Sequence, residues 1–222
     1  NDGSYPYLGH AWFPDDVNKG QVYVSLNNAS DTDFTVGSYD YITMVHELGH
    51  CFGLAHPHDN GGTSTLFPGV TGPWDLGKNQ QNQTMFTVMS YNDINGPLTP
   101  DVVQSYGFIS GPMAYDIYTI QKIYPGTVVK NEGNTTYTLA ISNQEGTFYE
   151  AIVDTGGIDT ISASGSTQGV TVNINVAKID GSTGGGGYVS KVIGIDGGYT
   201  IAKDVLIENI IGGLGNDVLI GN

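Results

Sequence analysis

Apolar side chains recur at helical spacing in two stretches of the chain. Residues 39–53 carry them three or four positions apart, at Ile42, Val45, Leu48 and Phe52, as one face of a helix requires. The same kind of spacing covers Met113 to Ile123, and Pro125 and Gly126 follow it as stop signals. The pattern therefore predicts two helices, one over each stretch.

Beyond residue 124 the helical spacing gives way to alternation. Residues 169–176, GVTVNINV, place apolar side chains at every second position, as half-buried strands do. Gly-rich turns, such as the run at residues 184–187, separate the stretches of this kind. The C-terminal part of the chain is therefore predicted to be all-β.

The part before this boundary is predicted to be mixed. Residues 7–13 (YLGHAWF) and 21–26 (QVYVSL) are candidate strands, and residues 57–106 are predicted to be mostly loop. Together with the two helices they indicate an α+β fold. We predict one domain over residues 1–124 and a second over residues 125–222.

Charge narrows the classes of partner. The chain has 22 acidic and 7 basic residues and a formal net charge of −15, which argues against nucleic acid and against an anionic membrane surface. No stretch approaches the roughly 18 apolar residues of a membrane-spanning helix. An excess of carboxylates suits bound cations better.

Three of the five histidines lie in one short segment, HELGHCFGLAH. On a helix His46 and His50 share a face, and a turn at Gly53 can bring His56 to the same ion. Three protein ligands leave a fourth position open, which is the pattern of a catalytic zinc. Glu47 flanks that face and can hold a water molecule. A chance pair of helical histidines is the alternative, and the added glycine and third histidine argue against it.

This chain resembles the metzincin zinc endopeptidases, whose extended motif H-E-x-x-H-x-x-G-x-x-H stands at residues 46–56. The Met-turn expected in that group is matched by VMSY at residues 88–91. Pro57 after the third histidine and the Gly/Asp repeats downstream resemble the serralysin family in particular. The resemblance implies a metzincin-type α+β catalytic domain followed by an all-β, RTX-type parallel β-roll.

The same resemblance implies roles for single residues. Met89 would form a hydrophobic floor below the histidines, and Tyr91 would be a zinc-proximal phenol that also stabilises the oxyanion. Without the zinc motif, core packing of Met89 and a surface turn at Tyr91 would be preferred. Glu47 would be the general base for hydrolysis by a zinc-activated water. The substrate would be an extended polypeptide bound along residues 7–13.

The C-terminal half carries candidate calcium ligands. Residues 212–220 fit one unit of the nonapeptide G-G-x-G-x-D-x-U-x, through Gly212, Gly213, Gly215 and Asp217. By resemblance to serralysins, further oxygen ligands are Asn131, Gly133, Thr135, Asp154, Gly156, Gly157, Asp159 and Glu208. A solvated acidic face is the alternative. Calcium is preferred because it would offset part of the negative charge.

The resemblance also bears on extent and location. Serralysins carry more sequence before the position of Asn1 and after that of Asn222, so we expect an N-terminally truncated catalytic domain and only the start of the roll. It implies a secreted, extracellular bacterial protein, exported in one step by a C-terminal signal.

Expected partners are peptide substrates, a protein inhibitor and a missing N-terminal fragment, with the chain a monomer. An RTX adhesion or binding module with an inactive zinc site is the alternative function, and the retained Glu47 argues against it.

Overall fold

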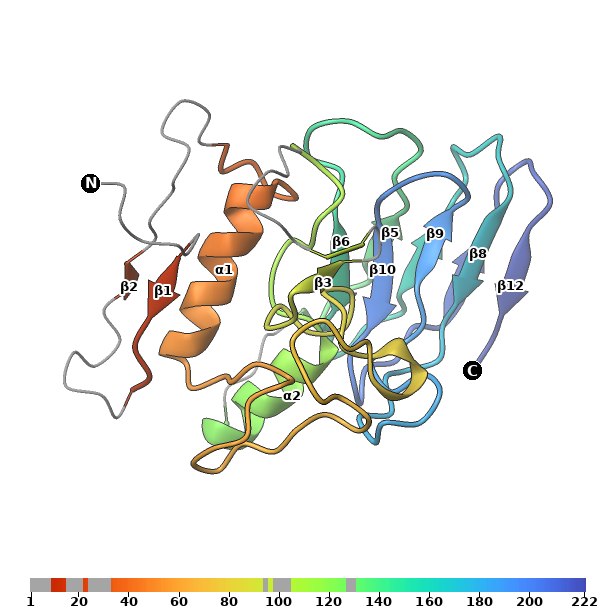
Figure 1. Cartoon of the computed structure of the whole chain (residues 1–222). Coiled ribbons are helices and arrows are strands. Elements are labelled where there is room, and N and C mark those ends of the chain that lie inside the picture. The colour runs from red at the N-terminus through yellow and green to blue at the C-terminus, as the bar shows by residue number, and fades with distance from the viewer. Residues whose placement is uncertain (1–8, 15–21, 24–32, 94–95, 98–104, 127–130) are drawn as a thin grey trace.

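The computed structural model describes residues 9–14, 22–23, 33–93, 96–97, 105–126 and 131–222 (Figure 1). Its first half contains helix α1 (Tyr39–Cys51), the short 3-10 helix η1 (Lys78–Gln80) and helix α2 (Ala114–Ile123). Two antiparallel pairs of short strands accompany them, β1 (His10–Ala11) with β2 (Val22–Tyr23) and β3 (Asn92–Asp93) with β4 (Gly96–Pro97). Neither α-helix in the described ranges is long and apolar enough to cross a bilayer.

Helix α1 is bounded by capping residues. The Ser38 hydroxyl oxygen accepts a hydrogen bond from Tyr41 N at 3.2 Å, which satisfies one of the free N–H groups of the first turn. Gly53 follows the helix with a φ of +89°, a conformation open to glycine at little cost. The helix therefore stops where the chain must turn toward His56.

The buried face of α1 differs from the predicted one. Ile42 is buried as expected, but Leu48 and Phe52 are 39% and 50% exposed. The helix buries His46 and His50 instead. Packing of the histidine face thus overrides the apolar spacing toward the end of the helix.

Helix α2 is fixed to the segment before Met89 by one buried carboxylate. Asp116 Oδ2 accepts hydrogen bonds from Met113 N at 2.8 Å and from Val88 N at 2.7 Å. Thr87 Oγ1 donates to Asp116 Oδ1 at 2.6 Å. The start of α2 and the turn that carries Met89 are therefore held together.

Residues 131–222 form two sheets. The larger has strand order β12-β8-β9-β10-β6 and comprises β6 (Tyr149–Ile152), β8 (Val170–Asn173), β9 (Ser190–Val192), β10 (Gly198–Ile201) and β12 (Val218–Ile220). The smaller has order β11-β7-β5 and comprises β5 (Thr136–Thr138), β7 (Thr160–Ser162) and β11 (Asn209–Ile211). The prediction of an all-β C-terminal half is confirmed.

The parallel pairing expected of a roll holds except at β9. The smaller sheet is parallel throughout, and in the larger one β12 pairs with β8 and β10 with β6 in parallel. Strand β9 is antiparallel to both β8 and β10. The connection from β9 to β10, residues 193–197, is too short for a parallel crossover, so it closes a hairpin.

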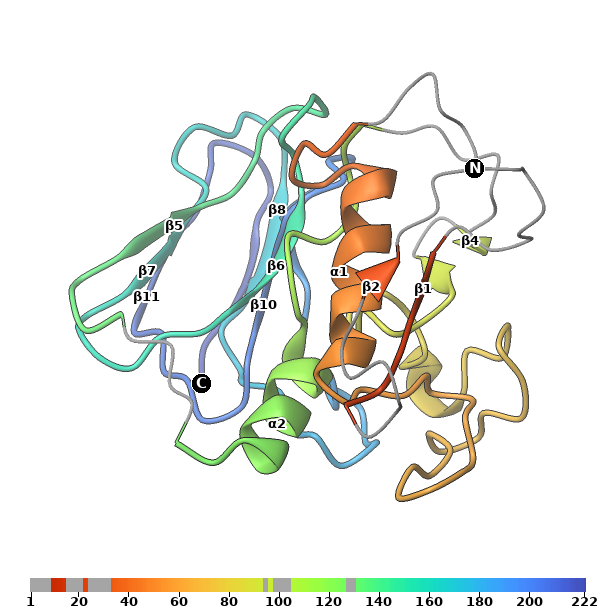
Figure 2. The same ribbon diagram turned by 90° about the vertical axis from the view of Figure 1, so that its left-hand side faces the viewer.

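The elements are arranged in layers (Figure 2). The two sheets face each other across an apolar core that includes Ile152, Ile161, Val172 and Ile201. Helix α1 lies on the outer side of the larger sheet, where Tyr149 and Ala151 of β6 join a second core with Ile42, Met89 and Phe108. Ile117 of α2 packs against both cores. The boundary at residue 124 stays a prediction, and packing crosses it.

The remaining predictions of secondary structure agree in part where they can be compared, since residues 9, 12 and 13 of the first predicted strand are not strand. Of residues 7–13, the strand in the described part covers His10–Ala11, and of residues 21–26 it covers Val22–Tyr23. The other residues of the second range, and residues 7–8, lie outside the described ranges. Between residues 57 and 106 the described chain is mostly loop, as predicted.

Candidate metal centre

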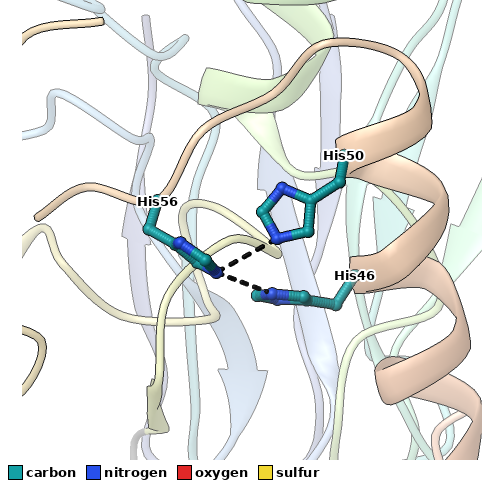
Figure 3. Close-up of side chains that lie close together, drawn as sticks. All are labelled: His46, His50 and His56. Atoms are coloured by element: carbon teal, nitrogen blue, oxygen red, sulfur yellow. Dashed lines mark hydrogen bonds between the residues drawn. The ribbon is translucent and has the colours of Figure 1, made fainter. Parts of the chain in front are cut away.

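The three histidines of the motif converge on one point (Figure 3). His46 and His50 project from the same face of α1, and the turn after Gly53 returns His56 toward them. The Nε2 atom of His56 lies 3.1 Å from His46 Nε2 and 3.1 Å from His50 Nε2. These nitrogens are close enough to share one ion.

The other ring nitrogens fix the tautomers. His46 Nδ1 contacts Val88 O, His50 Nδ1 contacts Leu54 O, and His56 Nδ1 contacts Asp59 Oδ2, each at 2.8 Å. A carbonyl or carboxylate oxygen only accepts, so each Nδ1 carries a proton and each Nε2 presents a lone pair. Three lone pairs meeting at this distance repel one another unless a cation lies between them. The donor set fits a zinc ion.

The environment also keeps these imidazoles neutral, as metal binding requires. Burial, with the neighbouring histidines adding to it, lowers the pKa of His46 to about 3. Burial lowers the pKa of His56 to about 4, and it lowers that of His50 as well.

Glu47 lies beside this cluster and is 5% exposed. Its Oε2 atom has no hydrogen-bond partner within the described structure. Burial raises the pKa of the Glu47 carboxyl to about 7. Gly9, the residue before strand β1, packs tightly against the Glu47 side chain, since a Cβ atom on Gly9 would lie 2.8 Å from Glu47 Cγ. A buried carboxylate of raised pKa next to a metal-type cluster has the character of a proton acceptor.

Tyr91 and Met89 occupy two further sides of the cluster. Tyr91 Oη lies 2.9 Å from His56 Nε2. Burial raises the pKa of the Tyr91 phenol to about 12, with Glu47 and Asp59 adding to the shift, so the phenol keeps its proton. Met89 is 1% exposed, and a Cβ atom on Gly49 would lie 2.6 Å from its sulfur. The methionine thus packs closely against α1 at Gly49, the residue before His50.

The predicted calcium ligands around Asp154 also lie close together. Asp154 and Asp159 are 5% and 1% exposed, and no basic side chain of the described residues forms an ion pair with either. Tyr137 Oη donates to Asp154 Oδ2 at 2.6 Å, and Thr135 N donates to Asp159 Oδ1 at 2.8 Å. Two buried carboxylates without a described cation fit a site for Ca²⁺.

The other members of this set surround the same carboxylates. Asp159 N donates to Glu208 Oε2 at 2.7 Å, and Gly156 N donates to Asp154 Oδ1 at 3.1 Å. Thr155 N donates to Asn131 O at 3.0 Å, and Thr135 Oγ1 donates to Gly133 O at 3.2 Å. The structure therefore brings together Asn131, Gly133, Thr135, Asp154, Gly156, Gly157, Asp159 and Glu208.

The nonapeptide unit forms a separate tight turn before β12. Asp217 Oδ2 accepts from Gly213 N at 2.8 Å, and its Oδ1 accepts from Val170 N at 3.1 Å. A Cβ atom on Gly212 would lie 2.6 Å from Asp217 Oδ2, and one on Gly215 would lie 2.4 Å from the backbone of Gln168. The glycines of the unit are therefore required by close packing, and its aspartate joins the turn to β8.

In the cluster around Asp154, Gly157 and Gly156 offer a matched test of how closely the backbone packs. Gly157 has a φ of +120°, and a Cβ atom there would lie 2.5 Å from Gly133 O, whereas a Cβ atom on Gly156 meets no atom within 4 Å. Gly157→Ala is expected to lower the free energy of unfolding by about 1–3 kcal/mol, and Gly156→Ala by less than about 0.5 kcal/mol. Urea unfolding of both variants measures this. Equal effects of the two substitutions would contradict the assigned backbone geometry.

Comparison with known proteins identifies the family. The family model "Peptidase M10 serralysin C terminal" matches residues 126–222. The chain is 33% identical over 230 residues to "Metalloprotease AprA" of Pseudomonas entomophila, an alignment that covers 96% of this chain and 44% of the relative. It is 33% identical over 242 residues to "Serralysin" of Photorhabdus luminescens, covering 99% of this chain and 44% of the relative. The chain belongs to the serralysin family.

The alignments show which parts of this serralysin-family chain are matched. Coverage of 99% of the chain leaves room for only a few unmatched residues, so the alignment includes the histidine segment as well as residues 126–222. "Serralysin B" of Dickeya chrysanthemi is 33% identical over 241 residues, an alignment that covers 98% of this chain and 41% of the relative. The chain thus spans less than half the length of these relatives.

Two carboxylates of this serralysin-family chain were not found from the sequence. Asp59 accepts from His56 Nδ1 and also from His56 N at 3.0 Å. Asp116 accepts hydrogen bonds from two backbone N–H groups, that of Met113 just before α2 and that of Val88 just before Met89. Asp59 could have been found from its position three residues after His56, where a turn brings a carboxylate back to the ring. The role of Asp116 depends on a long-range contact and has no local signal.

Removal of the Asp59 carboxylate should weaken zinc binding. Asp59→Ala deletes the acceptor that fixes the His56 tautomer, so we expect zinc affinity to fall about 10- to 100-fold. Competition with a chromogenic chelator measures the dissociation constant. Asp180→Ala, which removes an exposed carboxylate bonded to Ser182 N, is the matched control and should leave it unchanged. An unaltered zinc affinity in Asp59→Ala would show that Asp59 does not position His56.

Proposed function

We propose that this protein is a secreted zinc-dependent endopeptidase that hydrolyses extended polypeptides. One observation carries the proposal. The Nε2 lone pairs of His46, His50 and His56 converge while every Nδ1 is occupied by an acceptor. Beside them lies the buried Glu47 carboxylate, whose Oε2 has no hydrogen-bond partner among the described residues. A purely structural zinc site would need the three imidazoles but not the carboxylate.

The proposed ligands are the three histidines, with Tyr91 as a fourth group close to them. When bound, zinc supplies Lewis acidity, which polarises a peptide carbonyl and makes water acidic enough to attack near neutral pH. Met89, which packs against α1 at Gly49, would form the hydrophobic floor of the site. Residues 1–124 would then contain part of a metzincin-type catalytic domain.

Glu47 and Tyr91 would carry the proton and charge transfers. Glu47 accepts a proton as the water oxygen bonds to the carbonyl carbon, and it returns that proton to the amine when the C–N bond breaks. The Tyr91 hydroxyl, kept protonated by its raised pKa, can leave His56 and donate a hydrogen bond to the developing oxyanion. A comparable donor is worth about 2.7–4 kcal/mol in other enzymes.

Strand β1 supplies a direction for the substrate. Gly9 precedes β1 and approaches Glu47 closely, so a peptide extended along this strand would pass the general base. Backbone pairing would hold such a peptide in register, and its side chains would alternate between the protein and solvent.

Residues 125–222 would form the calcium-binding part, with Ca²⁺ as a structural ion. Its ligands would come from the oxygen-rich cluster around Asp154 and Asp159 and from the nonapeptide turn at residues 212–217. Secretion and one-step export, a protein inhibitor and association with an N-terminal fragment are part of the same proposal. They rest on the family relationship and not on the site geometry.

Zinc removal tests the proposed reaction. The protein is stripped with 1,10-phenanthroline, dialysed in the presence of Ca²⁺, and assayed on casein before and after addition of zinc. We expect hydrolysis to disappear on stripping and to return with one zinc ion per chain. Hydrolysis that persists without zinc, or protein that never cleaves casein in either state, would overturn the proposed function.

A further inference from the structure

Trp74 is a large exposed side chain beside the candidate metal centre. It is 53% exposed, and its ring centroid lies 5.9 Å from that of Tyr91. Tyr91 in turn contacts His56 Nε2. The indole is therefore one aromatic ring away from the point where the histidines converge.

The backbone on both sides of Trp74 is held firmly. Pro73 O accepts hydrogen bonds from Asn92 Nδ2 at 3.0 Å and from Asn82 Nδ2 at 3.3 Å. Asp75 O accepts from Asn82 Nδ2 at 2.7 Å. Both asparagines are buried. The chain thus fixes the position of Trp74 with buried polar groups while it leaves the indole in solvent.

This arrangement also fixes Trp74 relative to the metal centre. Asn92 directly follows Tyr91, so the residue that anchors the Trp74 turn is covalently joined to the residue that contacts His56. An exposed apolar surface on a fixed backbone loses little conformational entropy when it binds a ligand. Tryptophan in such a position is a typical anchor of binding sites.

We propose that Trp74 binds a large apolar or aromatic side chain of the peptide substrate, at one fixed position near the bond that is cleaved. This inference rests on the proposed peptidase function and names a specificity-determining residue for it. Asp75 Oδ2 accepts hydrogen bonds from Thr71 N at 2.9 Å and from the Thr71 hydroxyl, within its own turn. The contact that we assign to the substrate side chain is therefore the exposed indole face, on which an aromatic ring can stack.

Binding without cleavage tests the inference. Zinc-loaded Glu47→Gln protein is titrated by calorimetry with Ala-rich hexapeptides in which a single Phe is moved through the six positions. We expect one register to bind about tenfold more tightly than the all-Ala peptide. Adding Trp74→Ala should abolish that difference, and Trp74→Phe should retain most of it. Phe52→Ala is the matched control, since Phe52 is 50% exposed on α1, and it should keep the full difference.

The outcomes separate this inference from the function on which it rests. The calorimetric assay does not depend on hydrolysis, so it tests the inference separately from the reaction. Absence of casein cleavage by the parent protein would overturn the proposed function. An equal preference for Phe with and without Trp74 overturns the inference. A Trp74-dependent preference for Arg over Phe in the same peptides would overturn the assigned side-chain class.

Discussion

Glu47→Gln is expected to reduce casein hydrolysis by about 10²–10⁴-fold, the usual contribution of a general acid–base group. Glutamine keeps the shape of the side chain but cannot accept the proton of the attacking water. The carboxylate is not part of the histidine cluster and its Oε2 has no partner in the described structure. Zinc content and melting temperature should therefore stay close to those of the parent protein.

Glu145→Gln is the matched control for this substitution. Its carboxylate is exposed and accepts a hydrogen bond from Thr35 Oγ1, far from α1's histidines in sequence. Hydrolysis by this variant should equal that of the parent. Equal hydrolysis by Glu47→Gln and parent protein would exclude Glu47 as the base, and a zinc-free Glu47→Gln protein would assign it a structural role instead.

Removal of calcium is expected to have the second largest effect. Ions that bind only the folded state stabilise it by about 2.7 kcal/mol at 100 times the dissociation constant, so EGTA should lower the melting temperature by about 5–10 °C for a chain of this size. Without the ion, the buried carboxylates of Asp154 and Asp159 lose their compensating charge. Differential scanning calorimetry with and without EGTA measures the shift.

A pair of variants assigns that effect to residues. Asp159→Asn should reduce the shift caused by EGTA, because one buried ligand oxygen is lost. Asp204→Asn changes an exposed carboxylate on the same half of the chain, and asparagine tolerates its φ of +64°. The control should melt like the parent in both buffers. Identical melting curves of the parent with Ca²⁺ and with EGTA would remove the calcium assignment.

The histidine cluster could be predicted because its geometry is local. His46, His50 and Gly53 lie on one helix and its end, and His56 is only three residues further, so helical pitch and one left-handed turn bring the rings together. The helices and the all-β half could be predicted for the same reason, since each follows from spacing within a short segment. These parts of the fold are determined by residues that are close together in the sequence.

The remainder depends on contacts between distant segments. The exposure of Leu48 and Phe52 could not be predicted, because apolar spacing does not show that α1 buries its two histidines and packs Gly49 against Met89. The antiparallel place of β9 depends on a hairpin within an otherwise parallel pattern. Trp74 lies near Tyr91 only because Asn92 and Asn82 bind the backbone on either side of it. Such pairings have no signature in a single sequence.

The central claim is that three histidines of this chain bind one zinc ion. X-ray absorption spectroscopy at the zinc edge, on zinc-loaded protein that cleaves casein, tests it most directly. The account predicts three imidazole nitrogens at about 2.0–2.1 Å together with oxygen ligation. Fewer than three imidazole ligands would contradict it. So would a zinc–sulfur distance of about 2.3 Å, which would indicate that Cys51 binds the ion.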